Sequence, residues 1–126
     1  EDGGSAVLSP DVWELATIDN GVQAGTQHFR EFGVTPAMVD KTGPFDRRLV
    51  LHLDRICKEN QLSHQRDLFK HYRSDLAAAV EAGFDVRTAL IAIGLDGSHG
   101  HERTHLDAIR TASELAHLYL LSPLLD

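Results

Sequence analysis

The chain has 126 residues, of which 42% are hydrophobic and 25% charged, and its formal net charge is −7. These values are typical of a single globular domain, residues 1–126, and exclude a disordered tail. The acidic balance argues against a duplex nucleic acid or an anionic membrane surface as a partner. No apolar run reaches the roughly 18 residues that a membrane-spanning helix needs.

Cysteine and histidine usage add two further constraints. Cys57 is the single cysteine, so no internal disulfide can form, which fits a reducing compartment and predicts a cytoplasmic protein. No basic segment followed by an apolar core opens the chain, so no signal peptide is expected. Eight histidines are an excess for this length, and they prompt a search for a metal site.

The first third of the chain predicts two strands. Residues 1–11 are small and polar and indicate an entry turn. Residues 12–18 (VWELATI) are apolar and β-branched, and predict a buried strand that ends at the turn signal Asp19-Asn20-Gly21. Residues 20–31 lack periodicity and predict a loop. Residues 33–39 predict a second strand, with a bulge or an edge position at Pro36, followed by a loop over residues 40–44.

The rest of the chain alternates helices and strands. An apolar stripe predicts a helix that begins after Asp46 as N-cap and ends near Asn60; it consists of Leu49, Val50, Leu53, Ile56 and Cys57. Residues 64–72 predict a short, weak strand. An Ala-rich helix follows Ser74-Asp75 and ends at Gly83. Residues 87–95 (RTALIAIGL) predict a central buried strand, and residues 101–121 the longest helix, ended by Pro123.

This order of elements predicts an α/β domain with a mixed sheet and flanking helices. Ligands of such sheets collect at the loops that follow strand ends. Two of these loops carry side chains that can bind a metal: Asp19 directly after the first predicted strand, and His99 directly after the last one.

Residues 101–105 read His-Glu-Arg-Thr-His, which matches the H-E-x-x-H pattern of zinc peptidases. On a helix, this spacing places His101 and His105 one turn apart on one face, with Glu102 as general base. A tetrahedral site needs a third protein ligand. Glu114 and His117, further along the same predicted helix, would lie about 13 to 18 Å from His105, which is too far to close one site. This zincin-like metalloprotease therefore remains an alternative.

Several segments, taken together, resemble a known family. They are IDNG (18–21), VTPAMVDKTGPFD (34–46), HQRD (64–67), RSDLAAAVEAG (73–83) and GSHGHERTH (97–105). In this order and spacing the chain resembles the C-terminal part of the tetrahedral-aminopeptidase family of co-catalytic metallopeptidases. It is most similar to a bacterial subgroup encoded with genes for a dipeptide-amide osmoprotectant. The similarity runs from about Ser9 to Pro123.

The resemblance implies an α/β catalytic domain that holds two divalent ions, zinc or cobalt, and hydrolyses N-terminal residues from peptide substrates. It implies that Asp19 and His99 are metal ligands, and that Asp75 lies beside the site in a supporting role. Two ions can hold one water between them and lower its pKa to near neutrality. The positions of Asp19 and His99 after predicted strands and the family resemblance thus select the same two residues.

The same resemblance implies that much of the site is missing. The first histidine ligand, the bridging aspartate and the glutamate pair with the general base would lie upstream of Glu1, and no Glu-Glu pair occurs in the chain. We therefore expect a fragment of a longer peptidase that binds metal weakly and is inactive alone. Half of a sheet would leave an unpaired strand edge and exposed core, so we also expect a homo-oligomer or association with the missing part. A non-catalytic α/β module for assembly is the third alternative.

Overall fold

The computed structural model describes residues 3–23 and 25–126, and within them an α/β arrangement of a mixed sheet with flanking helices, which confirms the predicted fold class. The helices are α1 (Gly3–Val7), α2 (Arg47–Glu59), α3 (Asp75–Glu81) and α4 (Leu106–Leu121). The strands are β1 (Glu14–Val22), β2 (Val34–Ala37), β3 (Val39–Asp40), β4 (Gly43–Pro44) and β5 (Arg87–Leu95). None of these helices is both long and apolar enough to cross a membrane.

The main sheet has the strand order β1-β5-β2, and β3 and β4 form a separate antiparallel ribbon. β1 runs parallel to β5, from the pair Glu14 and Arg87 to the pair Val22 and Leu95. β2 runs antiparallel to β5. The predicted central strand over residues 87–95 is confirmed, because β5 lies between the other two strands and is buried along most of its length.

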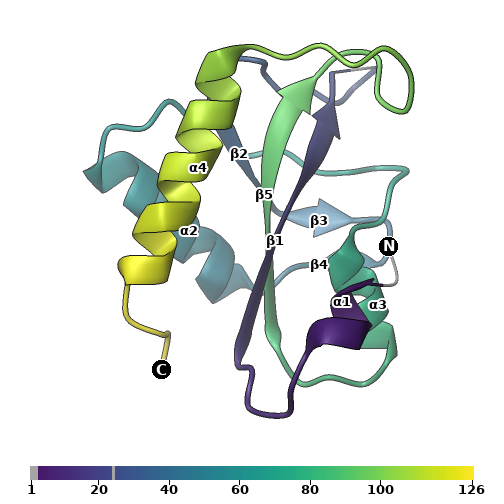
Figure 1. Cartoon of the computed structure of the whole chain (residues 1–126), viewed down its shortest axis with the longest axis vertical. Helices are drawn as coiled ribbons and strands as arrows, with labels where there is room; N and C mark the ends of the chain where they lie inside the picture. Colours follow the sequence, from purple (N-terminus) through teal and green to yellow (C-terminus); the bar gives the residue numbers. More distant parts are fainter. Residues whose placement is uncertain (1–2, 24) are drawn as a thin grey trace.

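Helices cover both sides of the sheet, with α2 and α4 to one side and α1 and α3 to the other (Figure 1). Side chains of β5 alternate between two cores, as the two-residue period of a strand requires. Ala89 and Ile91 join the core formed with α2 and α4, whereas Leu90 and Ala92 join the core that contains Leu76 of α3. Because β1 and β5 run parallel, their carboxyl ends lie at the same end of this layered domain.

Capping residues fix two of the helices where the sequence predicted them. The Asp46 carboxylate accepts a hydrogen bond from Leu49 N over 2.9 Å at the start of α2, and Asn60 caps its end. Gly83 has φ +87° directly after the Ala-rich helix α3, which is the left-handed conformation typical of a C′ glycine. Ser74 occupies the N-cap of α3 but its hydroxyl donates to Asp40 instead of capping the helix.

Two predictions in the N-terminal part of the chain were wrong. The expected entry turn contains the short helix α1, which packs on α3. β1 does not end at Ile18 but continues to Val22 through the Asp19-Asn20-Gly21 segment, because β5 offers a pairing partner along its whole length. Tertiary pairing thus overrides a local turn signal.

Two further predictions were wrong in the second half. Residues 64–72 form no strand, and only single bridges join His64 to Val34 and Asp67 to Ala37. The last helix begins at Leu106, not at residue 101, because an antiparallel bridge between Asp96 and Arg103 holds the preceding residues in a closed loop. His105 is therefore the N-cap of α4 rather than part of the helix.

Candidate metal site

A pocket of about 250 Å³ lies at the carboxyl ends of β1 and β5 and collects the residues predicted as a site. Its walls come from β1, from the loop that follows β5, and from the segment that leads into α3. They consist of Ile18, Asp19, Asn20, Val22, Phe69, Tyr72, Arg73, Asp75, Ser98 and His99. Asp19 and His99, 80 positions apart in the chain, thus line one pocket together with Asp75. The carboxyl end of a parallel pair of strands is where α/β proteins bind ligands.

His99 is presented by a loop that is closed at its base. Asp96 N donates to Arg103 O over 2.9 Å, and Arg103 N donates to Asp96 O over 3.0 Å. Inside the loop, His99 N donates to a Glu102 carboxylate oxygen over 3.0 Å. His99 itself has φ +62°, a left-handed conformation that is uncommon for a residue with a side chain and costs on the order of 1–3 kcal/mol. Such local strain is typical of functional sites. His99 is exposed and lines the pocket.

Asp19 lies inside β1, opposite Ala92 of β5, and not after the strand end as predicted. Its side chain is on the exposed side of the strand, and one carboxylate oxygen accepts a hydrogen bond from Asn20 N over 2.7 Å. That bond orients the carboxylate without burying it.

Asp75 is the first residue of α3 and is half-buried. Its neighbour Ser74 is anchored to Asp40, with Ser74 N and Oγ each 2.9 Å from the Asp40 carboxylate. This anchor fixes where α3 begins and hence where Asp75 meets the pocket. A carboxylate in the first turn of a helix is also favoured by the helix dipole.

Sequence analysis missed Arg73 and Tyr72, which line the same pocket. The Arg73 guanidinium pairs with the Glu81 carboxylate over 2.7 Å. The only sequence signal was their position just before Asp75.

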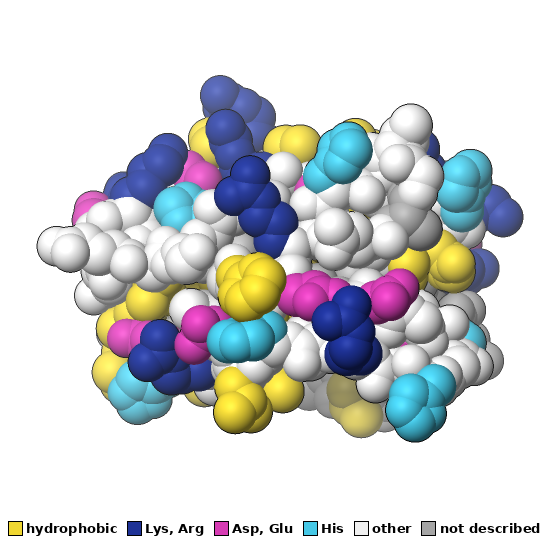
Figure 2. Space-filling model, turned by 90° about the horizontal axis from the view of Figure 1, so that it is seen from above, with side chains coloured by type: hydrophobic (Ala, Val, Ile, Leu, Met, Phe, Trp, Pro, Cys, Tyr) yellow, Lys and Arg dark blue, Asp and Glu magenta, His cyan; other side chains and the backbone are white. Residues whose placement is uncertain are grey.

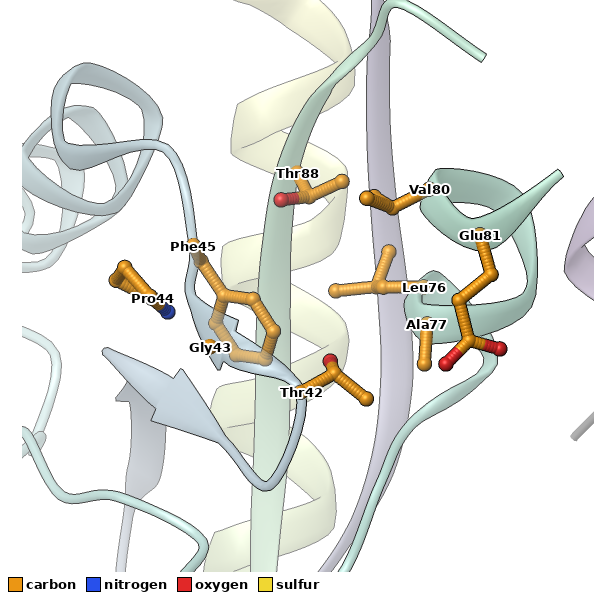
Figure 3. Close-up of a pocket in the computed structure, with 9 residues that line it drawn as sticks. All are labelled: Thr42, Gly43, Pro44, Phe45, Leu76, Ala77, Val80, Glu81 and Thr88. Carbon is orange, nitrogen blue, oxygen red and sulfur yellow. The ribbon is translucent and has the colours of Figure 1, made fainter. Parts of the chain in front are cut away.

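Glu81 also borders a second pocket, of about 270 Å³, between the β3–β4 ribbon, β5 and α3 (Figure 3). Its walls are mainly apolar, with Phe45, Leu76 and Val80, and it contains none of the predicted site residues.

The H-E-x-x-H segment does not have the geometry that its alternative function requires. Residues 101–105 lie outside α4, so the two imidazoles are not displayed on one face of a helix. His105 Nδ1 accepts a hydrogen bond from Asp107 N over 3.1 Å, and its ring packs against Phe32 with centroids 4.5 Å apart. Through the hydrogen bond from Asp107 N, His105 caps the start of α4. The helical premise of the zincin alternative is therefore wrong.

The donors in the pocket suit a divalent metal but are too few to enclose one. A carboxylate and an imidazole are the ligands that borderline ions such as zinc and cobalt accept. Within residues 3–23 and 25–126, no group of three or more His, Cys, Asp and Glu residues is arranged to hold a metal ion. At this end of the molecule, histidines lie scattered among acidic and basic side chains rather than clustered (Figure 2). Asp19 and His99 together fit a part of a metal site.

Comparison with known proteins relates the chain to peptidases. The family profile described as M42 glutamyl aminopeptidase matches residues 4–115. The Bacillus subtilis (strain 168) protein named "Putative aminopeptidase YhfE" is 31% identical over 122 residues, which make up 97% of this chain and 35% of that protein. The chain thus spans about a third of the length of this curated relative.

Two solved structures share the fold. Aminopeptidase APDkam598 from the archaeon Desulfurococcus kamchatkensis superposes with a TM-score of 0.75 at 16% identity, over 85% of this chain and 33% of that one. The TET1 peptidase of Pyrococcus horikoshii, described as assembling into a tetrahedron or a large octahedral shell, gives a TM-score of 0.69 at 18% identity. That match covers 84% of this chain and 32% of the other. At such low identity these matches establish similarity of fold.

Proposed function

The chain belongs to the M42 glutamyl aminopeptidase family, as its sequence resemblance indicated, and we propose that it is the C-terminal part of the catalytic domain of a dinuclear-metal aminopeptidase. The observation that carries this proposal is the shared pocket of Asp19, His99 and Asp75 at the carboxyl ends of two parallel strands. The reaction would be the hydrolysis of N-terminal residues from peptide substrates.

In this proposal Asp19 and His99 each donate one ligand to a pair of ions, zinc or cobalt. When bound, such ions supply a hydroxide near neutral pH and polarise the scissile carbonyl. The closed loop at Asp96 and Arg103 holds the His99 imidazole at the pocket, so that it need not be ordered on binding. Asp75, whose position is fixed through Ser74, orients the neighbouring groups as a positioning residue.

The remaining ligands and the general base would come from outside these 126 residues. Two ligands in one pocket bind a metal weakly, so we propose that the chain has no peptidase activity by itself. We also propose a cytoplasmic location, which fits a chain with a single cysteine, and a homo-oligomeric complete enzyme. Related solved chains described as a dodecamer and as a tetrahedral or octahedral shell support that last point.

A cobalt titration monitored by visible absorption tests the ligand assignment. We expect weak binding by the unaltered chain and a loss of affinity of at least about tenfold in His99→Ala and in Asp19→Asn, because each removes one of two ligands. Asp75→Asn should weaken binding about 10-fold or more through lost orientation.

His101→Ala is the matched control, since His101 is also an exposed loop histidine two residues away. It should leave cobalt affinity unchanged. If His101→Ala abolished binding and His99→Ala did not, the ligand assignment would be wrong. If the unaltered chain bound no divalent ion at all, a non-catalytic assembly module would be the better description.

A further inference from the structure

The loop that follows β5 is anchored to the rest of the fold at its far end (Figure 1). Besides the backbone bridge between Asp96 and Arg103, two nitrogens of the Arg103 guanidinium lie 3.0 and 3.3 Å from two carboxylate oxygens of Glu31. The next residue, Thr104, donates through Oγ1 to Gly94 O of β5 over 2.6 Å. These contacts fix both ends of the loop, but the histidine that lines the candidate metal pocket takes no part in them.

A separate hydrogen bond acts on His99 itself. His99 N donates to Glu102 Oε1 over 3.0 Å. Both residues are exposed, so this bond forms at the surface and competes with water. Its acceptor is a carboxylate, and a hydrogen bond to an ionised group is stronger than one between neutral groups. Glu102 thus connects the anchored end of the loop, next to Arg103, with the residue that reaches the pocket.

The backbone of His99 needs such a contact. Its φ of +62° is in the left-handed region, which a residue with a side chain adopts only when its surroundings compensate the strain. Gly100 N donates to Gly97 O over 2.9 Å, which closes a tight turn around His99. The angle φ also sets the direction of the Cα–Cβ bond relative to the preceding chain. If His99 relaxed to a negative φ between fixed loop ends, its imidazole would turn away from the pocket.

We propose that Glu102 is a positioning residue, whose carboxylate holds His99 in the left-handed conformation that turns the imidazole toward the candidate metal pocket. This role differs from the general base that the H-E-x-x-H pattern assigns, because Glu102 is not among the described residues that line the pocket. That the imidazole then binds a metal rests on the proposed function, whereas the conformation of His99 can be measured without metal.

NMR of the metal-free 126-residue chain tests the conformational part. At positive φ the amide and α protons of one residue lie closer together than at negative φ, so the nuclear Overhauser effect between them is stronger. His99 should show this strong effect in the unaltered chain. In Glu102→Ala the effect should weaken, and exchange of the His99 amide with solvent should accelerate by at least about threefold. Glu102→Gln keeps a carbonyl oxygen as acceptor and should resemble the unaltered chain.

The cobalt titration tests whether this conformation serves the metal. Glu102→Ala should weaken cobalt binding by at least about tenfold, as the loss of a contact behind a metal ligand does. Glu102→Gln should keep the affinity within about threefold of the unaltered chain, since the hydrogen bond remains. Glu114→Ala is the matched control, because Glu114 is an exposed glutamate of α4 outside the walls of the pocket. It should change neither measurement.

Three results would overturn the proposal. The His99 Overhauser effect could be as strong in Glu102→Ala as in the unaltered chain. Glu102→Gln could weaken cobalt binding as much as Glu102→Ala, which would mean that the charge acts and not the hydrogen bond. Cobalt affinity could also be lost in His99→Ala and unchanged in Glu102→Ala.

Failure of the proposed function would give a different result. Cobalt affinity would then be unaffected by His99→Ala. A weaker Overhauser effect in Glu102→Ala would still support the hold of Glu102 on the His99 backbone, because that measurement is made without metal.

Discussion

Asp40 joins the β3–β4 ribbon to the start of α3 through a buried carboxylate. It is only 3% exposed, and it accepts hydrogen bonds from Thr42 N and Oγ1 and from Ser74 N and Oγ. Burial alone raises the pKa of Asp40, but these hydrogen bonds outweigh it and hold the pKa below its usual value. The charged carboxylate is therefore part of the folded state.

Asp40→Asn should lower the free energy of unfolding by about 1.5–3 kcal/mol at pH 7, because an amide replaces a charged acceptor of several hydrogen bonds. A carboxyl group whose pKa is lowered by folding contributes stability above its unfolded pKa of about 3.9 and loses it as the pH falls through the folded value. The difference between variant and unaltered chain should thus begin to shrink as the pH falls below about 3.9. Urea unfolding at pH 7 and pH 3 measures it.

The exposed Asp85 provides the control, because Asp85→Asn should change stability by less than about 0.5 kcal/mol at both pH values. An Asp40→Asn effect that stayed constant down to pH 3 would contradict the assigned role of the charge.

At this scale, sequence reasoning could select residues by their local position. It selected Asp19 and His99 at expected strand ends, and the structure places both in one pocket. It also selected Asp46, one turn before an apolar stripe, which caps α2. Asp40 and Arg73 could not be found in that way, because their partners Ser74 and Glu81 lie 34 and 8 positions away. A side chain's partner across a fold is set by tertiary packing, which local sequence does not encode by itself.

The junction between α2 and the end of α4 depends on a buried histidine. His52 Nε2 lies 2.8 Å from Ser122 Oγ, the C-cap residue of α4, and Arg55 donates to His52 Nδ1 over 2.8 Å. Burial and the positive charge of Arg55 lower the pKa of His52, although Glu14 and Glu59 act in the opposite direction. His52 is thus neutral in the folded protein at pH 7.

Because folding lowers the pKa of His52, the unfolded chain binds the proton more tightly. This contribution to stability is present above the unfolded pKa of about 6.5 and is lost as the pH falls below it, by at most about 1.4 kcal/mol per pH unit. We expect His52→Gln to remove this part of the pH dependence between pH 7.5 and 5.5. Thermal unfolding across that range measures it, and the exposed His117→Gln serves as the control. Parallel pH profiles for His52→Gln and the unaltered chain would contradict the assignment.

Elements were predictable where local signals and tertiary contacts agree. For α2, the apolar stripe and the Asp46 cap both mark the same helix. They disagree at the start of α4, because the bridge between Asp96 and Arg103 joins two residues that no periodic pattern connects. They also disagree over the segment 64–72, whose hydrogen bonds to β2 are too few to form a strand.

On the scale of the whole molecule, one strand serves two cores. The fold class could be predicted from the alternation of strands and helices along the chain. The central strand could be predicted because β5 is apolar through its middle, as a strand covered on both faces is. Which edge of the sheet remains open could not be predicted. That depends on segment 63–69 covering β2 and on α4 packing mainly on β5 and β2.

The two cores should unfold together because they share β5. Leu115 lies in the core with α2 and α4, and Leu76 lies in the opposite core; both are at most 1% exposed. Leu115→Ala and Leu76→Ala should each lower the free energy of unfolding by about 2–5 kcal/mol, through lost burial and the cavity left behind. Either change should shift one common transition, since neither core keeps its central strand when the other opens.

Cys57 offers a probe of this coupling, because it is buried in the core opposite Leu76 and burial, with the nearby charge of Asp54, raises its pKa to about 12. The thiol is therefore unreactive until its core opens. In urea, Leu76→Ala should expose Cys57 to a thiol reagent at the same concentration at which far-UV circular dichroism is lost. The exposed Val80→Ala should leave that concentration nearly unchanged. Partial loss of dichroism while Cys57 stays protected would mean that the two layers unfold independently, and that β5 does not couple them.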